Sequence, residues 1–144
     1  PPPRPYIGRM SALTDFETLN RPGTPNTYLV LPKGFASSAT ADEASPDFQE
    51  DPAALFGRVL HLISGRERWS VEQQDTSLLQ LEPIAKTKLL KFKDDISIRV
   101  LPRGDGAALA IYSRSRVGHS DLGANRKRVQ ALLQELKEKA PGAA

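Results

Sequence analysis

The chain has 144 residues, of which 39% are hydrophobic and 26% are charged, and this length and balance predict one globular domain. It contains no cysteine, so disulfide bonds and thiolate metal sites are excluded, and no apolar run approaches the roughly 20 residues of a membrane span. The net charge of +3 is mildly basic, and charge is unevenly distributed along the chain. The stretch from Gly34 to Gly57 contains five acidic residues and no lysine or arginine.

The first 20 residues are predicted to form an extended N-terminal arm, because Pro1 to Pro5 cannot join a helix interior. Within the arm, apolar residues at intervals of three indicate either a short helix or an irregular segment packed on the domain: Met10, Leu13, Phe16 and Leu19. Turn residues follow, and Tyr28–Leu31 is predicted to be a brief strand that Pro32 ends. The small, polar stretch Lys33–Pro46 indicates a loop.

The clearest predicted helix begins after Asp51, which suits the N-cap, and Pro52 suits the first helical position. Gly65 is the expected stop at the C-terminal end. Its apolar residues fall on one side and predict packing against a sheet: Leu55, Phe56, Val59, Leu60 and Ile63. His61 lies beside this stripe, and we interpret it as a packed or surface residue rather than a ligand.

After Gly65 the apolar period changes to two, which indicates a series of strands. They are predicted in Arg66–Gln74, Ser77–Ile84, Lys86–Lys93 and Asp95–Leu101, followed by a hairpin turn at Arg103–Gly106 and a final strand. The whole order predicts an α+β domain, in which a mainly antiparallel sheet of four to six strands carries two helices on one face.

One stretch, from Ile111 to Val129, runs from the final strand through a glycine-rich turn into a second helix. Alternation places Arg114 and Arg116 on one side of the strand, opposite Leu109, Ile111, Ser113 and Ser115. In the turn between Gly118 and Gly123, Ser120 or Asp121 is expected to accept hydrogen bonds from the first helix amides. The helix has one apolar stripe, formed by Val129, Leu132, Leu133 and Leu136.

The first turn of this helix is basic, although the helix dipole disfavours positive charge there, so an acidic residue should compensate. Asp94 and Asp95, which point to opposite faces of an extended segment, and Asp121 are the nearest candidates. One hypothesis is an internal network of charge-assisted hydrogen bonds. The other is a pocket for an anion, or for an acidic patch on a partner, formed by Arg114, Arg116, Arg126 and Arg128. The predicted binding or structural cluster comprises Asp94, Asp95, Arg114, Ser115, Arg116, Ser120, Asp121, Asn125, Arg126 and Arg128.

Catalytic templates fit this sequence poorly. The motif Gly118-His-Ser-Asp-Leu-Gly123 is not a nucleophile elbow, because its second glycine falls one place late. His119 is too close along the chain to serve Ser120 as a base, so His61 would have to be brought there. Two histidines without cysteine predict no metal site, and the glycine pattern predicts no cofactor. With Tyr112 as its one aromatic residue, the arginine-rich stretch lacks a stacking platform, so we expect no nucleic-acid partner.

Three stretches carry a family resemblance: SRSRVGHSDLGANRKRV from Ser113 to Val129, FKDDISIRV from Phe92 to Val100, and PNTYLVLP from Pro25 to Pro32. Over roughly Arg21 to Leu136, the chain resembles the domain-of-unknown-function 1499 family. The resemblance implies no catalytic residue, because that family has no established activity. It also implies that the protein comes from a bacterium or a photosynthetic eukaryote. The plant and algal members of that family look like plastid proteins, and some of them are placed in the thylakoid lumen. The proline-rich start without Met would suit a mature imported chain.

We therefore expect a soluble, non-catalytic protein-binding module, peripheral to the membrane, that serves as an accessory or assembly subunit of a photosynthetic thylakoid complex. Its partners would be the protein subunits of that complex. The binding role rests on the N-terminal arm, the charge polarity and the failure of the catalytic templates, whereas the plastid location rests on the resemblance. The bacterial cytoplasm or periplasm is the alternative location. The competing hypothesis is a small-molecule or anion-binding enzyme that uses the Arg/Asp/Ser cluster. Expected limits are 1–20 for the arm, 21–139 for the family domain and 140–144 for a tail.

Overall fold

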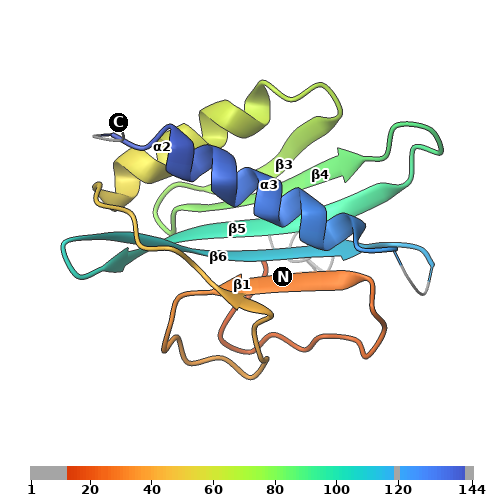
Figure 1. The fold of residues 1–144 in the computed structure, drawn as a ribbon, viewed down its shortest axis with the longest axis horizontal. Helices are drawn as coiled ribbons and strands as arrows, with labels where there is room; N and C mark the ends of the chain where they lie inside the picture. Colours follow the sequence, from red (N-terminus) through yellow and green to blue (C-terminus); the bar gives the residue numbers. More distant parts are fainter. Residues whose placement is uncertain (1–12, 119–120, 142–144) are drawn as a thin grey trace, which may run out of the picture.

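The alternating and helical apolar patterns produce one sheet and two helices in the computed structural model, which describes residues 13–118 and 121–141 (Figure 1). The strands are β1 (Thr27–Leu31), β2 (Glu43–Ala44), β3 (Trp69–Asp75), β4 (Gln80–Lys86), β5 (Lys93–Arg103) and β6 (Gly106–Ser115). The helices are α2 (Pro52–Ser64) and α3 (Ala124–Glu138). The predicted α+β architecture is confirmed.

The sheet has the strand order β2-β1-β6-β5-β4-β3, in which β1 and β2 are parallel and the other neighbours are antiparallel. The β5–β6 hairpin forms the centre, and its register pairs Asp94 with Ser115 and Asp95 with Arg114. Because side chains alternate between faces, Asp94 and Ser115 share the face that carries the helices, whereas Asp95 and Arg114 share the other. This hairpin therefore divides the predicted cluster between two faces.

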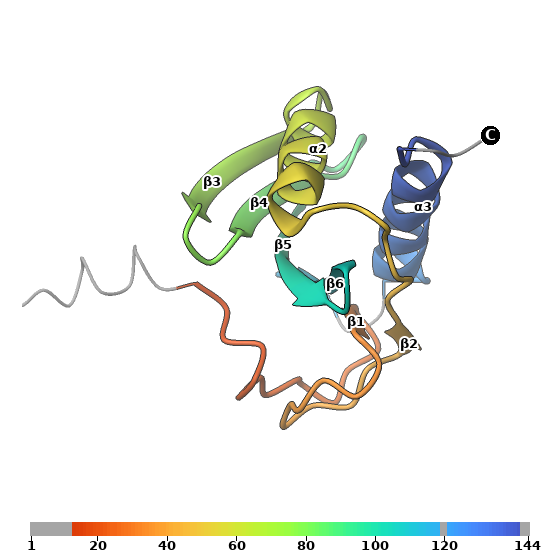
Figure 2. The same cartoon turned by 90° about the vertical axis from the view of Figure 1, so that its left-hand side faces the viewer.

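Both helices cover the same face of the sheet, as Figures 1 and 2 show. Helix α2 begins as predicted, because the Asp51 carboxylate accepts a hydrogen bond from the Ala53 amide at 2.9 Å, and it ends at Gly65. The buried stripes of the two helices are Leu55, Phe56, Val59 and Ile63 in α2, and Val129, Leu132, Leu133 and Leu136 in α3. Within the described residues, neither helix is long and apolar enough to cross a membrane.

The other face of the sheet is partly covered by residues 13–20, which are irregular and lie across it from the helices (Figure 2). Phe16 is fully buried in a small cluster with Leu29, Leu31, Ala110 and Tyr112. Thr14 ties the segment down, because its amide donates to the Glu82 carboxylate at 3.0 Å. Of the two predictions for the arm, residues 13–20 follow the irregular packed segment, and Met10 lies outside the described residues.

The predicted strand Lys86–Lys93 is wrong, because residues 87–92 form the loop that connects β4 to β5. The loop is closed by a hydrogen bond from the Thr87 amide to the Phe92 carbonyl and by one from the Phe92 amide to the Thr87 hydroxyl, both at 2.9 Å. Leu89 and Leu90 are adjacent, so no alternation could bury both on one face. The sixth strand is instead β2, which lies in the predicted loop Lys33–Pro46.

Candidate functional site

The predicted cluster is organised around Asn125, whose side chain is fully buried in the first turn of α3. Its amide nitrogen lies 3.0 Å from the Asn26 carbonyl oxygen, 2.9 Å from the Ser115 hydroxyl and 2.6 Å from the Asp121 carboxylate. These acceptors come from the segment before β1, the end of β6 and the turn before α3. One buried side chain therefore fastens three separate segments to the helix.

Arg128 extends this network to β5. Its guanidinium donates to the Asp94 carboxylate at 2.7 Å and to the amide oxygen of Asn125 at 2.9 Å. Ser113 donates to the same amide oxygen at 2.5 Å. The side chains of Arg128 and Asp94 are only 15% and 4% exposed, so water screens their attraction weakly. An acidic residue thus compensates the basic first turn of α3, as the helix-dipole argument predicted.

Asp121 orders the turn that leads into α3. Its carboxylate accepts hydrogen bonds from the backbone amides of Gly123 at 2.8 Å and of Asn125 at 3.0 Å. Burial raises the pKa of Asp121, but these amides and the Asn125 side chain outweigh burial, so the pKa lies below its usual value. Asp121 accepts a hydrogen bond from a first helix amide, as predicted, although the N-cap residue itself is Gly123. Ser120, the other candidate, lies outside the described residues.

The remaining arginines of the cluster lie elsewhere. Arg116 makes a two-pronged contact with Asp95, at 2.8 Å for both hydrogen bonds, on the face opposite the helices. On the same face, Arg114 donates to the Ser97 hydroxyl at 2.8 Å and stacks 4.7 Å from the centre of the Tyr112 ring. Arg126 is exposed on the first turn of α3. The structure therefore does not bring Arg114, Arg116, Arg126 and Arg128 together around one pocket.

A cavity of about 380 Å³ lies beside the network, where the loop 87–92 faces the turn before α3. Its lining residues are Thr87, Phe92, Asp94, Ser115, Val117, Gly118, Asp121 and Ala124. Asp94, Ser115 and Asp121 are members of the predicted cluster, and each is hydrogen-bonded within the protein. Sequence reasoning missed Phe92 and Val117, which form the apolar side of the cavity. Both residues lie in the stretches that carry the family resemblance, which is the sequence signal that could have found them. The wrong prediction of a strand at Lys86–Lys93 placed Phe92 in the sheet instead of beside a cavity.

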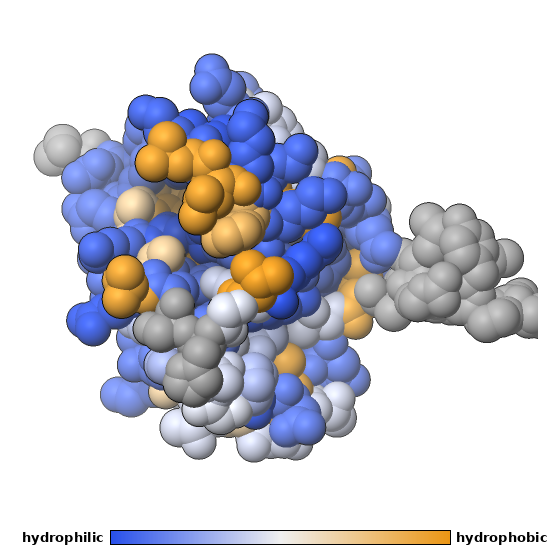
Figure 3. All heavy atoms as spheres, turned by 90° about the vertical axis from the view of Figure 1, so that its right-hand side faces the viewer, coloured by the Kyte–Doolittle hydropathy of each residue, from blue (hydrophilic) through white to orange (hydrophobic). Residues whose placement is uncertain are grey.

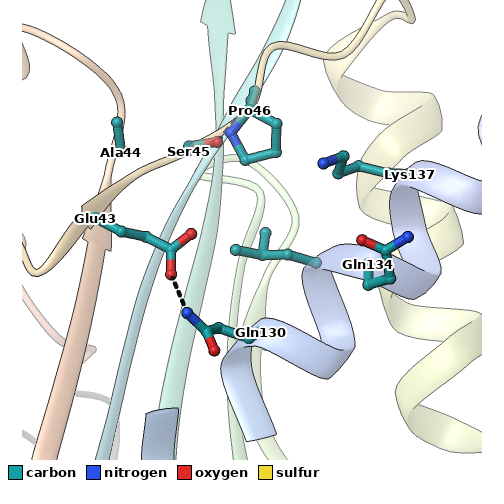
Figure 4. Close-up of a pocket in the computed structure, with 8 residues that line it drawn as sticks. Glu43, Ala44, Ser45, Pro46, Gln130, Gln134 and Lys137 are labelled. Atoms are coloured by element: carbon teal, nitrogen blue, oxygen red, sulfur yellow. Dashed lines mark hydrogen bonds between the residues drawn. The ribbon is translucent and has the colours of Figure 1, made fainter. Parts of the chain in front are cut away.

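A second cavity, of about 350 Å³, lies between α3 and the segment that contains β2 (Figure 4). Gln130, Gln134 and Lys137 project into it from the helix, and Gln130 donates to the Glu43 carboxylate at 3.2 Å. Among the described residues, no group of three or more histidine, cysteine, aspartate or glutamate side chains could hold a metal ion.

The acidic stretch that gives the chain its charge polarity is engaged within the fold. Its ion pairs join Asp42 to Arg21 at 2.8 Å, Asp47 to Arg103 at 3.0 Å, and Glu50 to Arg58 at 2.6 Å. Glu43 accepts a hydrogen bond from the Tyr28 hydroxyl, and Asp51 caps α2. The early acidic residues are therefore contacts that hold this domain together.

Comparisons with known proteins identify a family but no activity. No curated protein matches the chain. The crystal structure of Ara h 8.0201 is similar with a TM-score of 0.48 and 8% sequence identity, covering 65% of this chain and 91% of that one. The crystal structure of TTHA0849 from Thermus thermophilus is similar with a TM-score of 0.35 and 15% identity, covering 66% of this chain and 87% of that one. A family model matches residues 21–136, so the chain belongs to the family described as protein of unknown function (DUF1499).

Proposed function

We propose that this chain is a non-catalytic binding module that serves as an accessory or assembly subunit at the periphery of a photosynthetic thylakoid membrane complex. The observation that carries the proposal is the network around Asn125, in which the polar groups of the cluster bind one another. A catalytic group must be poised toward a substrate, and Asp94 instead faces Arg128 inside the protein. The cluster therefore supports the fold, and binding falls to the surface next to it.

That surface is the end of the domain formed by the loop 87–92 and the turn before α3. Its large apolar side chains are solvent-exposed: Leu89 by 86%, Leu90 by 70%, Phe92 by 46%, Val117 by 52% and Leu122 by 88%. We call these five residues the apolar end. Exposed apolar residues that gather in one place mark interaction surfaces in soluble proteins. The network behind the apolar end holds its two segments in place, since Asp94 follows the loop and Asp121 lies in the turn.

The setting at a thylakoid membrane is supported by the plastid character that the family resemblance implies, and a bacterial compartment is the alternative. The test is to solubilise native membranes gently, separate intact complexes by size and locate this chain by mass spectrometry. We expect it to migrate with a large photosynthetic complex. Migration alone, near its own mass of 15.8 kDa, would reject the proposal.

The cavity of about 380 Å³ favours a second candidate, a small-molecule-binding enzyme that uses Asp94, Ser115 and Asp121. The anion-binding form of this alternative lacks support, because the four arginines do not converge. A metabolite screen by thermal shift would distinguish the candidates. A compound whose stabilising effect disappears in folded Asp121→Asn protein but persists in Gln130→Ala protein, and which the wild-type protein then converts, would favour the enzyme.

A further inference from the structure

We propose that the apolar end inserts between the headgroups of an anionic lipid bilayer and holds the domain at the membrane surface. This inference deepens the proposed function and rests on it only for the setting beside a membrane. Figure 3 shows apolar side chains gathered among hydrophilic ones on this end of the molecule. The surface combines Leu89, Leu90 and Phe92 from one loop with Val117 and Leu122 from the other segment.

Positive charge surrounds the apolar end. Lys86, Lys88, Lys91 and Lys93 are all exposed and flank its apolar residues along the chain. In the part of the chain that the structure describes, none of these four lysines lies within 4.0 Å of an acidic group. The first turn of α3 adds two further exposed cations, Arg126 and Lys127.

Few negative charges oppose these cations. Asp94 is buried against Arg128, Asp95 is paired with Arg116, and Asp121 is engaged by helix amides. The acidic stretch around β2 and the start of α2 neutralises arginines elsewhere in the domain. The apolar end therefore carries a local excess of positive charge, and its chemical complement is a surface with anionic groups above an apolar layer.

A lipid headgroup layer fits this combination better than a protein partner does. Lysine is depleted from the buried centres of protein interfaces, because its ammonium group is costly to desolvate. At a bilayer, the aliphatic stems of lysines can lie beside inserted leucines while their ammonium groups reach phosphates. The loop 87–92 is compact, and the two hydrogen bonds between Thr87 and Phe92 reduce the backbone polarity that insertion would bury.

Binding to vesicles tests the inference. Flotation should show that the wild-type protein binds vesicles of phosphatidylcholine with about one quarter phosphatidylglycerol, and binds pure phosphatidylcholine vesicles much less. The double variant Leu89→Ser, Leu90→Ser should bind the anionic vesicles at least about tenfold more weakly. Leu78→Ser is the matched control, because Leu78 is 42% exposed in the β3–β4 turn at the opposite end of the sheet, and it should bind as the wild type does.

A second pair of variants tests the charge. The double variant Lys88→Glu, Lys91→Glu should abolish the preference for anionic vesicles. The control variant Lys33→Glu, Lys137→Glu makes the same change of net charge away from the apolar end and should keep the preference.

Unchanged binding by either double variant of the loop would overturn the inference. Wild-type protein that ignores anionic vesicles but migrates with a complex would overturn it while leaving the proposed function intact. If the vesicle results are as expected but the chain migrates alone when solubilised membranes are separated by size, the inference is supported and the proposed function is rejected.

Discussion

Asp94 and Asp95 are neighbours in β5, yet Asp94 forms an ion pair with Arg128 of α3 and Asp95 forms one with Arg116 on the opposite face of the sheet. The first pair is almost buried, with side-chain exposures of 4% and 15%, whereas the second is open, with exposures of 30% and 44%. Two identical side chains, one position apart, therefore experience very different surroundings.

This difference predicts unequal effects of the same substitution. Asp94→Asn leaves the Arg128 guanidinium nearly buried without a counter-charge, and should lower the free energy of unfolding by about 3 kcal/mol. Asp95→Asn breaks a pair that water already screens, and should cost about 0–1 kcal/mol. Urea unfolding of both variants at neutral pH measures the two losses. Equal losses would show that the Asp94–Arg128 pair does not hold α3 to the sheet.

Much of the fold could be predicted because its signals are local. Ile96, Ile98 and Val100 alternate in β5, and all three are buried under the helices. Asp51 caps the start of α2 as its chemistry favours, and α2 ends at Gly65, although Gly65 has a right-handed conformation with φ −85°. The stretch 86–93 misled the prediction because it is rich in apolar residues, although their spacing does not match a strand. Strand β2 carries little sequence signal, since its two residues are fixed by pairing with β1.

The candidate site could be predicted only in part. Its motif members were recognised, and alternation correctly separated Arg114 and Arg116 from Ser113 and Ser115. What the sequence could not show is which face of the strand α3 would cover, because that depends on long-range packing. The face that α3 covers determines that Arg128 contacts Asp94. It also determines that Phe92 and Val117 line one cavity.

Asp121 should make the stability of the protein sensitive to acid. Its pKa lies below the usual value of 3.8 because amides at the start of α3 favour the charged carboxylate. The unfolded chain therefore takes up the proton first as the pH falls, so this stabilisation is present above the unfolded pKa and is lost through the folded pKa. Asp121→Asn replaces one of the two accepting oxygens by an amide nitrogen that cannot accept a hydrogen bond, so it should cost about 1 kcal/mol at neutral pH and weaken the loss of stability in acid.

Urea unfolding between about pH 2 and pH 7 measures the effect of Asp121. Asp105→Asn is the control, because it makes the same change of charge at an exposed residue of the β5–β6 turn, and it should alter the stability at neutral pH by no more than about 0.5 kcal/mol. If the Asp121 and Asp105 variants gave the same profile, the hydrogen bonds that the Asp121 carboxylate accepts would not contribute to stability.

Tyr28 should make the stability of the protein depend on pH in the alkaline range. Burial, together with the hydrogen bond to Glu43 and its charge, raises the pKa of Tyr28 from 10.0 to about 12. The unfolded chain loses the phenolic proton first, so the stabilisation is complete below pH 10 and is lost as the pH rises toward 12. Tyr28→Phe removes this titration, and the difference in unfolding free energy between wild type and variant should shrink by about 1–2 kcal/mol across that range. A difference that does not change with pH would contradict the assignment.

Gly106 and Gly57 should respond to alanine with opposite signs. A Cβ at Gly106 would lie 2.0 Å from the Phe48 carbonyl oxygen, and Phe48 is held there by two backbone hydrogen bonds with Ala107, at 2.8 and 2.9 Å. Gly106→Ala should therefore cost about 2–3 kcal/mol or more, because neither backbone can move without breaking this bridge. Gly57 is exposed inside α2 with nothing within 4 Å of an added Cβ, so Gly57→Ala should stabilise the protein by about 0.5–1 kcal/mol. Thermal unfolding of the two variants gives the signs directly, and a Gly106→Ala protein as stable as the wild type would mean that the Phe48–Ala107 bridge does not fix the start of β6.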